Sequence, residues 1–270
     1  MSRPRGGPAG GWGPGQDGPA GDSGGAGPGR RFLRVGHKGA DGIVAGNTSA
    51  SFDAALAAGV EMIEFDVLSE HADGTGELYL AHDYEHLRAA GTLTLADGLD
   101  HLGGPDFDRV LLDVDLKLEG YELRSIDAVR AAGLLGRALF STMYPDSLTR
   151  IREAEPGVRL GWSVPRVRRD WTADRRTRVP AVAIGLVYRG LLPGRAGRAI
   201  AAGRCDALMV HWRLVSPALV RAIRRAGGEL YVWTVDDPDR IARLRRLGVT
   251  GVITNDPRVF GRPAGGAGAS

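Results

Sequence analysis

Short apolar runs alternate with helical patterns along most of this chain, and that alternation limits the folds it can adopt. The apolar runs stand at residues 33–37, 62–67, 78–83, 110–117, 138–143, 159–164, 207–212, 230–235 and 251–256. Helical patterns separate most of them, at 47–59, 93–102, 125–133, 145–157, 194–203, 216–228 and 237–248. Such alternation is typical of parallel strands with helices outside them. The length of the alternating region fits a single-domain α/β fold, a TIM-like (β/α)8 barrel.

The nine apolar runs are one more than an eight-stranded barrel uses. Residues 71–78 connect the second run to the third and leave no room for a full helix. We therefore expect one of the nine to be a short strand within a loop. An open, doubly wound sheet is the alternative, although no Gly-x-Gly-x-x-Gly follows a strand to bind a dinucleotide.

Composition limits the ordered part of the chain, its covalent links and its partners. Residues 1–30 and 263–270 are rich in small residues and almost free of large apolar ones, so we expect two disordered tails around a domain at 31–262. A single cysteine, Cys205, excludes an intramolecular disulfide. We expect no membrane span, because no apolar run approaches ~18 residues, and no secretory signal, which favours the cytoplasm. The net charge of +3 gives no reason to expect a nucleic-acid partner, and the oligomeric state is left open.

Polar side chains gather at or near the carboxyl ends of the predicted strands. They are His37, Glu64, Asp66, His82, Asp83, Asp115, Lys117, His211 and Trp233. In a barrel these ends form the active-site face, where a sequence shaped by stability alone would place apolar residues. Lysine occurs only at Lys38 and Lys117, since every other basic residue is arginine, which suggests a local role for both.

The carboxylates point to a cation. Glu64 and Asp66 lie two residues apart on one strand and therefore share a face. Two inward carboxylates repel each other and are costly to desolvate unless a cation neutralises them. On the strand at 110–117, Asp115 could add a third ligand and Lys117 could face a phosphate; a Lys117–Asp113 ion pair is the alternative. Ligation by oxygen alone suggests Mg²⁺ or Ca²⁺.

The histidines supply candidates for proton transfer. His37 and His82 end two strands beside the carboxylates and could act as general acid and base near neutral pH. His71, His86 and His101 fall in loops or helices, where we expect surface residues. His211 could line the pocket, and Trp233 could form either an apolar wall for a substrate or part of the core. Two histidines and a hard cation suit the cleavage of a phosphodiester.

These motifs occur in an order that resembles the glycerophosphodiester phosphodiesterase family of the phospholipase-C-like superfamily. They are H-K-G (37–39), N-T-S-A-S-F (47–52), E-F-D-V (64–67), H-D (82–83), D-L-K (115–117), W-T-V (233–235) and G-V-I-T-N-D-P (251–257). The resemblance implies a TIM-like barrel, a divalent metal and hydrolysis of glycerophosphodiesters to sn-glycerol 3-phosphate and an alcohol.

The resemblance also implies roles for single residues. It makes His37 and His82 the acid–base pair, and Glu64, Asp66 and Asp115 the metal ligands. It makes Lys117 a phosphate contact, and it assigns Asn47 to ordering the loop above the site. Lys38, His211 and Trp233 complete the residues expected to contact substrate.

Three departures from the family pattern bear on substrate choice. Lys38 replaces an arginine, so a bidentate phosphate fork becomes a point charge. Asp115 replaces a glutamate and shortens that ligand. The stretch 83–114 is shorter than in the family, which would leave the leaving-group site open.

Two alternative functions stay open: a lysophospholipase D or sphingomyelinase-like lipid phosphodiesterase, and a non-catalytic phosphate-binding barrel that uses the arginine run at 166–178. No strongly amphipathic anchor helix is evident for the first.

Overall fold

A computed structural model describes residues 31–166 and 175–261, except for the side chains of 175–184. Two predictions concern residues that the structure does not describe: the tails expected at 1–30 and 263–270. Of the arginine run at 166–178, residues 167–174 are not described, and the side chains of 175–178 are not described either.

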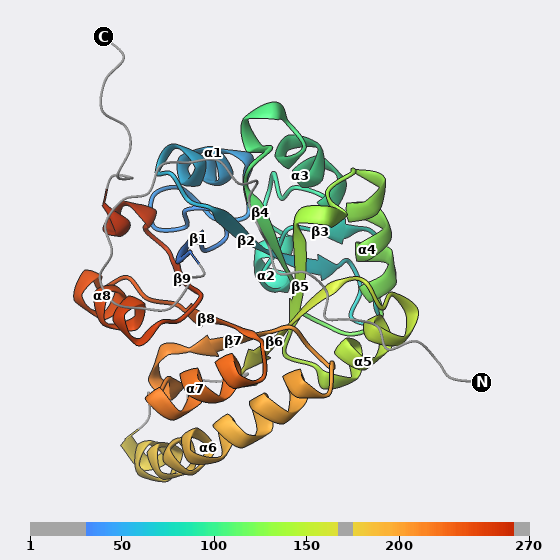
Figure 1. Ribbon diagram of the computed structural model, residues 1–270. Helices are drawn as coiled ribbons and strands as arrows, with labels where there is room; N and C mark the ends of the chain where they lie inside the picture. Colours follow the sequence, from blue (N-terminus) through green and yellow to red (C-terminus); the bar gives the residue numbers. More distant parts are fainter. Residues whose placement is uncertain (1–30, 167–174, 262–270) are drawn as a thin grey trace. The chain divides into compact units, whose positions relative to one another are not determined.

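Eight parallel strands close into a barrel (Figure 1). They are β1 (Leu33–Gly36), β2 (Met62–Ser69), β4 (Leu111–Leu116), β5 (Ala138–Thr142), β6 (Arg159–Val164), β7 (Ala207–His211), β8 (Glu229–Trp233) and β9 (Gly251–Thr254). The barrel is closed because β1 pairs with β2 on one side and with β9 on the other. The predicted (β/α)8 barrel is confirmed, and the open sheet is excluded.

The third apolar run, at 78–83, forms the short strand in a loop that was predicted for one of the nine. This strand, β3 (Leu78–Tyr79), pairs antiparallel with the end of β2. The predicted strand at 78–83 is wrong beyond Tyr79, because Asp83 caps the short helix α2 (Tyr84–Leu87) and accepts from the backbone N–H groups of Glu85 and His86. His82 consequently lies in a loop instead of on a barrel strand.

Helices connect the strands on the outside of the barrel (Figure 1). They are α1 (Ser49–Ala57), α3 (Leu95–Leu102), α4 (Glu122–Ala131), α5 (Pro145–Ala154), α6 (Arg175–Ala201), α7 (Pro217–Arg225) and α8 (Pro238–Leu247). Short 3-10 turns follow at η1 (Pro105–Phe107), η2 (Leu135–Arg137), η3 (Trp212–Leu214) and η4 (Pro257–Phe260). The side chains of Thr48, Thr94, Ser216 and Asp237 accept the first free N–H groups of α1, α3, α7 and α8.

One helix is much longer than its sequence pattern indicates. The pattern predicts a helix over 194–203, whereas α6 begins at Arg175 and spans 27 residues. Pro180 and Pro193 interrupt the pattern because proline lacks a backbone N–H group, yet the helix continues through both. Among the described residues, no helix combines the length and apolar character needed to cross a membrane.

The side chains of the strands divide by the face on which they lie. Along β2 and β4 the apolar members, such as Phe65, Val67, Val114 and Leu116, join the main core. A smaller apolar cluster holds Val35, Met62, Leu139, Ala207, Met209, Tyr231 and Ile253. Met62 and Ala207 are the first residues of their strands, whereas the charged residues of β2 and β4 come later. The acids therefore lie toward the carboxyl ends.

Candidate active site

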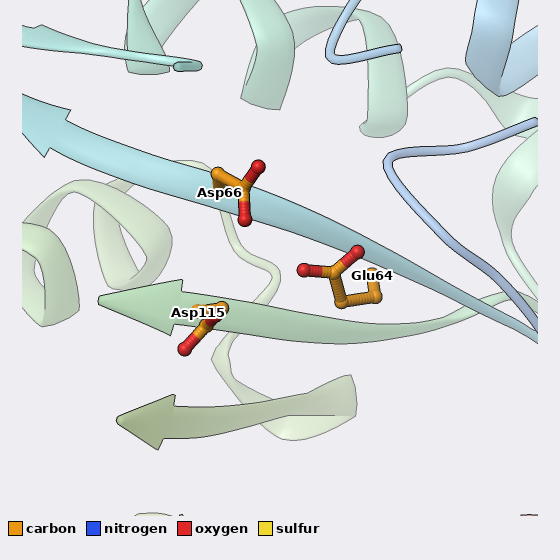
Figure 2. Close-up of side chains that lie close together, drawn as sticks. All are labelled: Glu64, Asp66 and Asp115. Atoms are coloured by element: carbon orange, nitrogen blue, oxygen red, sulfur yellow. The ribbon is translucent and has the colours of Figure 1, made fainter. Parts of the chain in front are cut away.

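Strand register brings the predicted carboxylates together. β2 and β4 are neighbours, with Glu64 beside Asp113 and Asp66 beside Asp115. One ligand oxygen from each of Glu64, Asp66 and Asp115 lies within 4.8 Å of the other two. Figure 2 shows Glu64 and Asp66 along β2 and Asp115 on the adjacent β4. The three predicted ligands thus form one cluster.

The electrostatics of this cluster suit a hard cation. Burial, and next the charge of Asp66, raise the pKa of Glu64 well above its usual value. Burial also raises the pKa of Asp66, but the charges of Lys117, His82 and His37 outweigh it and leave that pKa low. Oxygen ligands of Mg²⁺ or Ca²⁺ lie at roughly 2.0–2.6 Å, so two ligands of one ion can be about 5 Å apart. The donor set and its spacing therefore fit a divalent cation.

Lys117 follows β4 and lies between two of these acids. Its Nζ forms ion pairs with Asp66 Oδ1 and with Asp115 Oδ2, the latter at 2.6 Å. Burial lowers the pKa of Lys117, but the charges of Asp115, Asp66 and Glu64 overcome burial and raise it well above its usual value. Lys117 is therefore an ammonium ion at neutral pH. Lys117 thus pairs with Asp66 and Asp115, and not with Asp113 as in the alternative.

Asp113 lies beside Glu64 and is buried. Its Oδ1 has no hydrogen-bond partner among the described residues. Burial and the charge of Asp115 raise the pKa of Asp113 to about 8. Asp113 is accordingly a neutral acid through most of the physiological range, which sequence alone did not indicate.

The loop after β1 orients two of the acids. Lys38 and Asn47 have φ values of 50° and 58°, and these left-handed turns bring the loop back over β2. The Lys38 N–H donates to Glu64 Oε2 at 2.8 Å. Asn47 Nδ2 donates to Asp66 Oδ2 at 3.0 Å, and Asn47 Oδ1 accepts from the Asp66 N–H at 3.1 Å. Asn47 therefore holds a candidate ligand directly. The Lys38 ammonium lies 3.5 Å from Asp41 Oδ2.

A chain of hydrogen bonds fixes the ring of His37. Asp236 Oδ2 accepts from Asn255 Nδ2 at 2.8 Å, so the amide oxygen of Asn255 faces His37 Nδ1, 2.6 Å away. An amide oxygen only accepts, so Nδ1 carries the hydrogen and the neutral ring keeps its lone pair on Nε2. Burial lowers the pKa of His37. Nε2 lies 3.9 Å from Glu64 Oε2, and His37 is thus a neutral base beside the carboxylates.

His82 is half exposed and has a partner of its own. Its Nδ1 lies 3.3 Å from Asp83 Oδ2, while Asp83 Oδ1 lies 2.7 Å from His86 Nδ1. His86 is exposed, as predicted, but its ring centroid is only 6.4 Å from that of His82. His101, also predicted to be a surface residue, is partly buried and pairs with an aspartate.

His211 and Trp233 end the adjacent strands β7 and β8 on the same face of the barrel. They are register partners, and their rings lie 5.2 Å apart at an interplanar angle of 73°. Both side chains are partly exposed. The structure therefore brings this predicted pair together as an edge-to-face aromatic surface.

Sequence reasoning missed two residues of the site, Asn255 and Asp236. Asn255 belongs to the T-N-D-P stretch after β9, and Asp236 follows β8. Their position after strands was a usable signal. The contact of Asn255 with His37 depends on the closure of the barrel between β9 and β1, which sequence spacing does not specify.

Comparison with known proteins places this geometry in a family. A sequence model of the Glycerophosphoryl diester phosphodiesterase family matches residues 115–259, more than half of the chain. The chain belongs to this family. The matched range includes Asp115, Lys117, His211 and Trp233. It starts after the two candidate catalytic histidines, His37 and His82, whose charges both act on Asp66.

Individual family members resemble the chain over different extents. A glycerophosphodiester phosphodiesterase of Caldanaerobacter subterraneus is 23% identical over 85% of this chain and 96% of its own length. One of Arabidopsis thaliana is 47% identical over 51 residues, which cover 19% of this chain and 16% of that protein.

Solved structures of the family share the fold. A glycerophosphodiester phosphodiesterase from Parabacteroides distasonis has a TM-score of 0.64 at 17% identity and covers 85% of this chain and 95% of that one. An Oleispira antarctica phosphodiesterase, solved in complex with the product sn-glycerol-3-phosphate, has a TM-score of 0.60 at 19% identity, over 84% and 94% of the two chains. The family is one of phosphoric diester hydrolases, and the chain is assigned to that enzyme class.

Proposed function

We propose that the chain is a metal-dependent phosphodiesterase that hydrolyses glycerophosphodiesters to sn-glycerol 3-phosphate and an alcohol. The meeting of three carboxylates, Lys117 and a neutral His37 at the carboxyl end of the barrel carries this proposal. Family membership supports the reaction class, and the product bound to the Oleispira relative supports the substrate class.

Glu64, Asp66 and Asp115 would hold a Mg²⁺ or Ca²⁺ ion. When bound, such an ion supplies a Lewis acid that neutralises charge on the non-bridging oxygens of the phosphodiester. Asp115 contributes its oxygen to the cluster although it is shorter than the family's glutamate.

The substrate contacts follow from charge and shape. Lys117, held as an ammonium between Asp66 and Asp115, would contact a phosphate oxygen. Lys38 offers a second positive charge, as a point charge without the fork of an arginine. His211 and Trp233 offer an apolar surface to the carbon part of the substrate.

The two histidines move the protons. His37 Nε2, which has the lone pair, accepts a proton from the attacking water as its oxygen forms a bond to phosphorus. His82 donates a proton to the alcohol oxygen as the phosphorus–oxygen bond breaks. Asp83 accepts from His82 Nδ1 and so leaves Nε2 of the imidazolium as the donor. Asn255 stabilises the His37 imidazolium formed during this step.

A substrate panel with Mg²⁺, Ca²⁺ and a chelator tests the proposal. We expect release of choline and sn-glycerol 3-phosphate from glycerophosphocholine, and loss of this release with the chelator. Release of choline from lysophosphatidylcholine alone would favour the lipid phosphodiesterase alternative. No metal-dependent release from either substrate would contradict the proposal and favour a non-catalytic barrel.

Histidine variants test the acid–base pair. His37→Ala and His82→Ala should each lower kcat by about 10²–10⁴-fold, the usual range for general acid–base catalysis. His71→Ala is the matched control, because His71 is exposed and outside the cluster. If His82→Ala retains near-full activity while Asp66→Ala abolishes it, the two-histidine mechanism is wrong.

A further inference from the structure

Helix α6 carries the most exposed large apolar side chains in the described part of the protein. Leu186, Val187 and Leu191 are 62%, 64% and 58% exposed. The other exposed large apolar side chains of that part reach only 37–39%, and they lie apart from one another, in the loop after β1, on α4 and on α8. Single exposed apolar residues need no explanation, but three on one helix indicate a surface that binds something.

These three side chains lie opposite the face that packs on the protein. α6 buries Leu192, Ala196, Ala199 and Ile200, and contacts α7. At 3.6 residues per turn, the mean direction of Leu186, Val187 and Leu191 falls on the other side of the helix axis. Packing of the barrel therefore does not require them to be apolar. We call Leu186, Val187 and Leu191 the outer face of α6.

The charged residues in the sequence of α6 all have one sign. Residues 175–201 contain six arginines and no aspartate or glutamate. Arg195 and Arg198, one to two turns after the outer face, are both exposed. Apolar side chains together with arginines, and without acids, are the side-chain types that contact an anionic membrane surface.

The outer face lies toward the end of the barrel that carries the site. Arg189 Nη2 donates to Val215 O at 2.8 Å, and Val215 comes shortly after the carboxyl end of β7. α6 runs toward the start of β7, so Leu186 and Val187 lie still farther toward the site end.

We propose that the outer face of α6, with Arg195 and Arg198, docks the protein on an anionic lipid bilayer. The apolar side chains would enter the boundary between head groups and acyl chains, and the arginines would contact lipid phosphates. A second copy of the chain fits this surface less well, because pairing two copies of α6 would bring together two arginine-containing helices that have no acidic residue to pair with them. The inference rests on the outer face alone and does not depend on the proposed reaction.

Co-sedimentation of the full chain with vesicles tests the docking surface without substrate. We expect binding to vesicles of phosphatidylcholine mixed with phosphatidylglycerol, weaker binding to phosphatidylcholine alone, and a decrease as salt rises. The triple variant L186Q/V187Q/L191Q should lower the partition coefficient about tenfold or more, because three apolar side chains are lost. The control L123Q/L247Q changes two apolar side chains exposed on other helices and should bind like the wild type.

A second variant tests the charges and does not depend on how the first one folds. R195Q/R198Q should lower binding to the anionic vesicles about tenfold or more. All variants should keep their melting temperature and their activity on glycerophosphocholine in lipid-free buffer. The proposal is overturned if the wild-type chain does not sediment with anionic vesicles, or if both α6 variants sediment like it. A wild-type dimer that the triple variant converts to a monomer would also overturn it and assign the outer face to a second copy.

Discussion

Replacing Asn255 by leucine should test whether the orientation of His37 limits catalysis. The substitution removes the only side-chain acceptor that the described structure places on His37 Nδ1, at 2.6 Å. When Nε2 takes a proton the ring becomes cationic, and a hydrogen bond from a charged group contributes about 1.5–3 kcal/mol. At about 1.4 kcal/mol per tenfold in rate, kcat should fall about 10- to 150-fold. This is less than the loss expected for His37→Ala.

The pH–rate profile gives a second readout with a defined sign. The hydrogen bond that His37 Nδ1 donates to Asn255 raises the pKa of His37, whereas burial lowers it. Without Asn255 that pKa should fall further. A general base is active above its pKa, so the acidic limb of the profile should move to lower pH in Asn255→Leu. KM should change little, because Asn255 acts on His37 and not on substrate.

Two further variants separate orientation from a general loss of structure. Thr254→Val removes a neighbouring hydrogen bond to Asp236, at 2.8 Å, but keeps Asn255, and should retain activity within about threefold. The double variant H37A/N255L should be no slower than His37→Ala, because residues that act as one unit are not additive. If Asn255→Leu keeps full kcat with an unmoved acidic limb, His37 is not the base that Asn255 orients.

Three other outcomes follow from the site. Because the pKa of Asp113 is raised to about 8, stability should fall by up to about 1.4 kcal/mol per unit as pH rises from about 4 to 8. In thermal melts with a chelator, Asp113→Asn should therefore raise the melting temperature at pH 8 but hardly at pH 4; equal gains would refute the raised pKa. Divalent cations should raise the melting temperature of the wild type, and Glu64→Gln should lose that shift; a retained shift would place the ion elsewhere. Asp83→Ala, which frees His82 Nδ1, should lower kcat about tenfold, whereas the control Asp53→Ala should not.

The barrel could be predicted because its signal is repeated along the chain. Each strand is a short apolar run and most helices have a capping side chain, so single errors do not change the architecture. The errors fell where a local feature outweighed the pattern. The run 78–83 reads as one strand, but Asp83 caps α2 and ends it. Pro193 stands directly before the predicted start of the helix at residue 194, so the sequence pattern missed the earlier turns of α6. The helix continues through this proline because the neighbouring turns hold it.

The site could be predicted only to the level of single strands. Spacing by two placed Glu64 and Asp66 on one face, and the same rule grouped Asp113 with Asp115. It could not show that Asp113 lies beside Glu64 while Asp115 lies beside Asp66, since that depends on the register of β2 with β4. Contacts between distant loops, such as Asn255 with His37, were beyond sequence spacing altogether.

Register also explains how one small region holds four carboxyl groups beside a single lysine. The barrel sets Glu64 beside Asp113 and Asp66 beside Asp115, and all but Asp115 are buried. Lys117 neutralises charge on the pair nearer the carboxyl ends of the strands, because its ammonium contacts both Asp66 and Asp115. Among the described residues, Glu64 and Asp113 form no ion pair with a lysine or an arginine, and burial, with next the charge of a neighbouring carboxylate, raises the pKa of both. Of these two, Glu64 has an oxygen within the ligand cluster, so it is the acid that a divalent cation would ionise, while Asp113 would keep its proton. The register of β2 with β4 thus separates an acid that would bind a cation from one that would stay neutral.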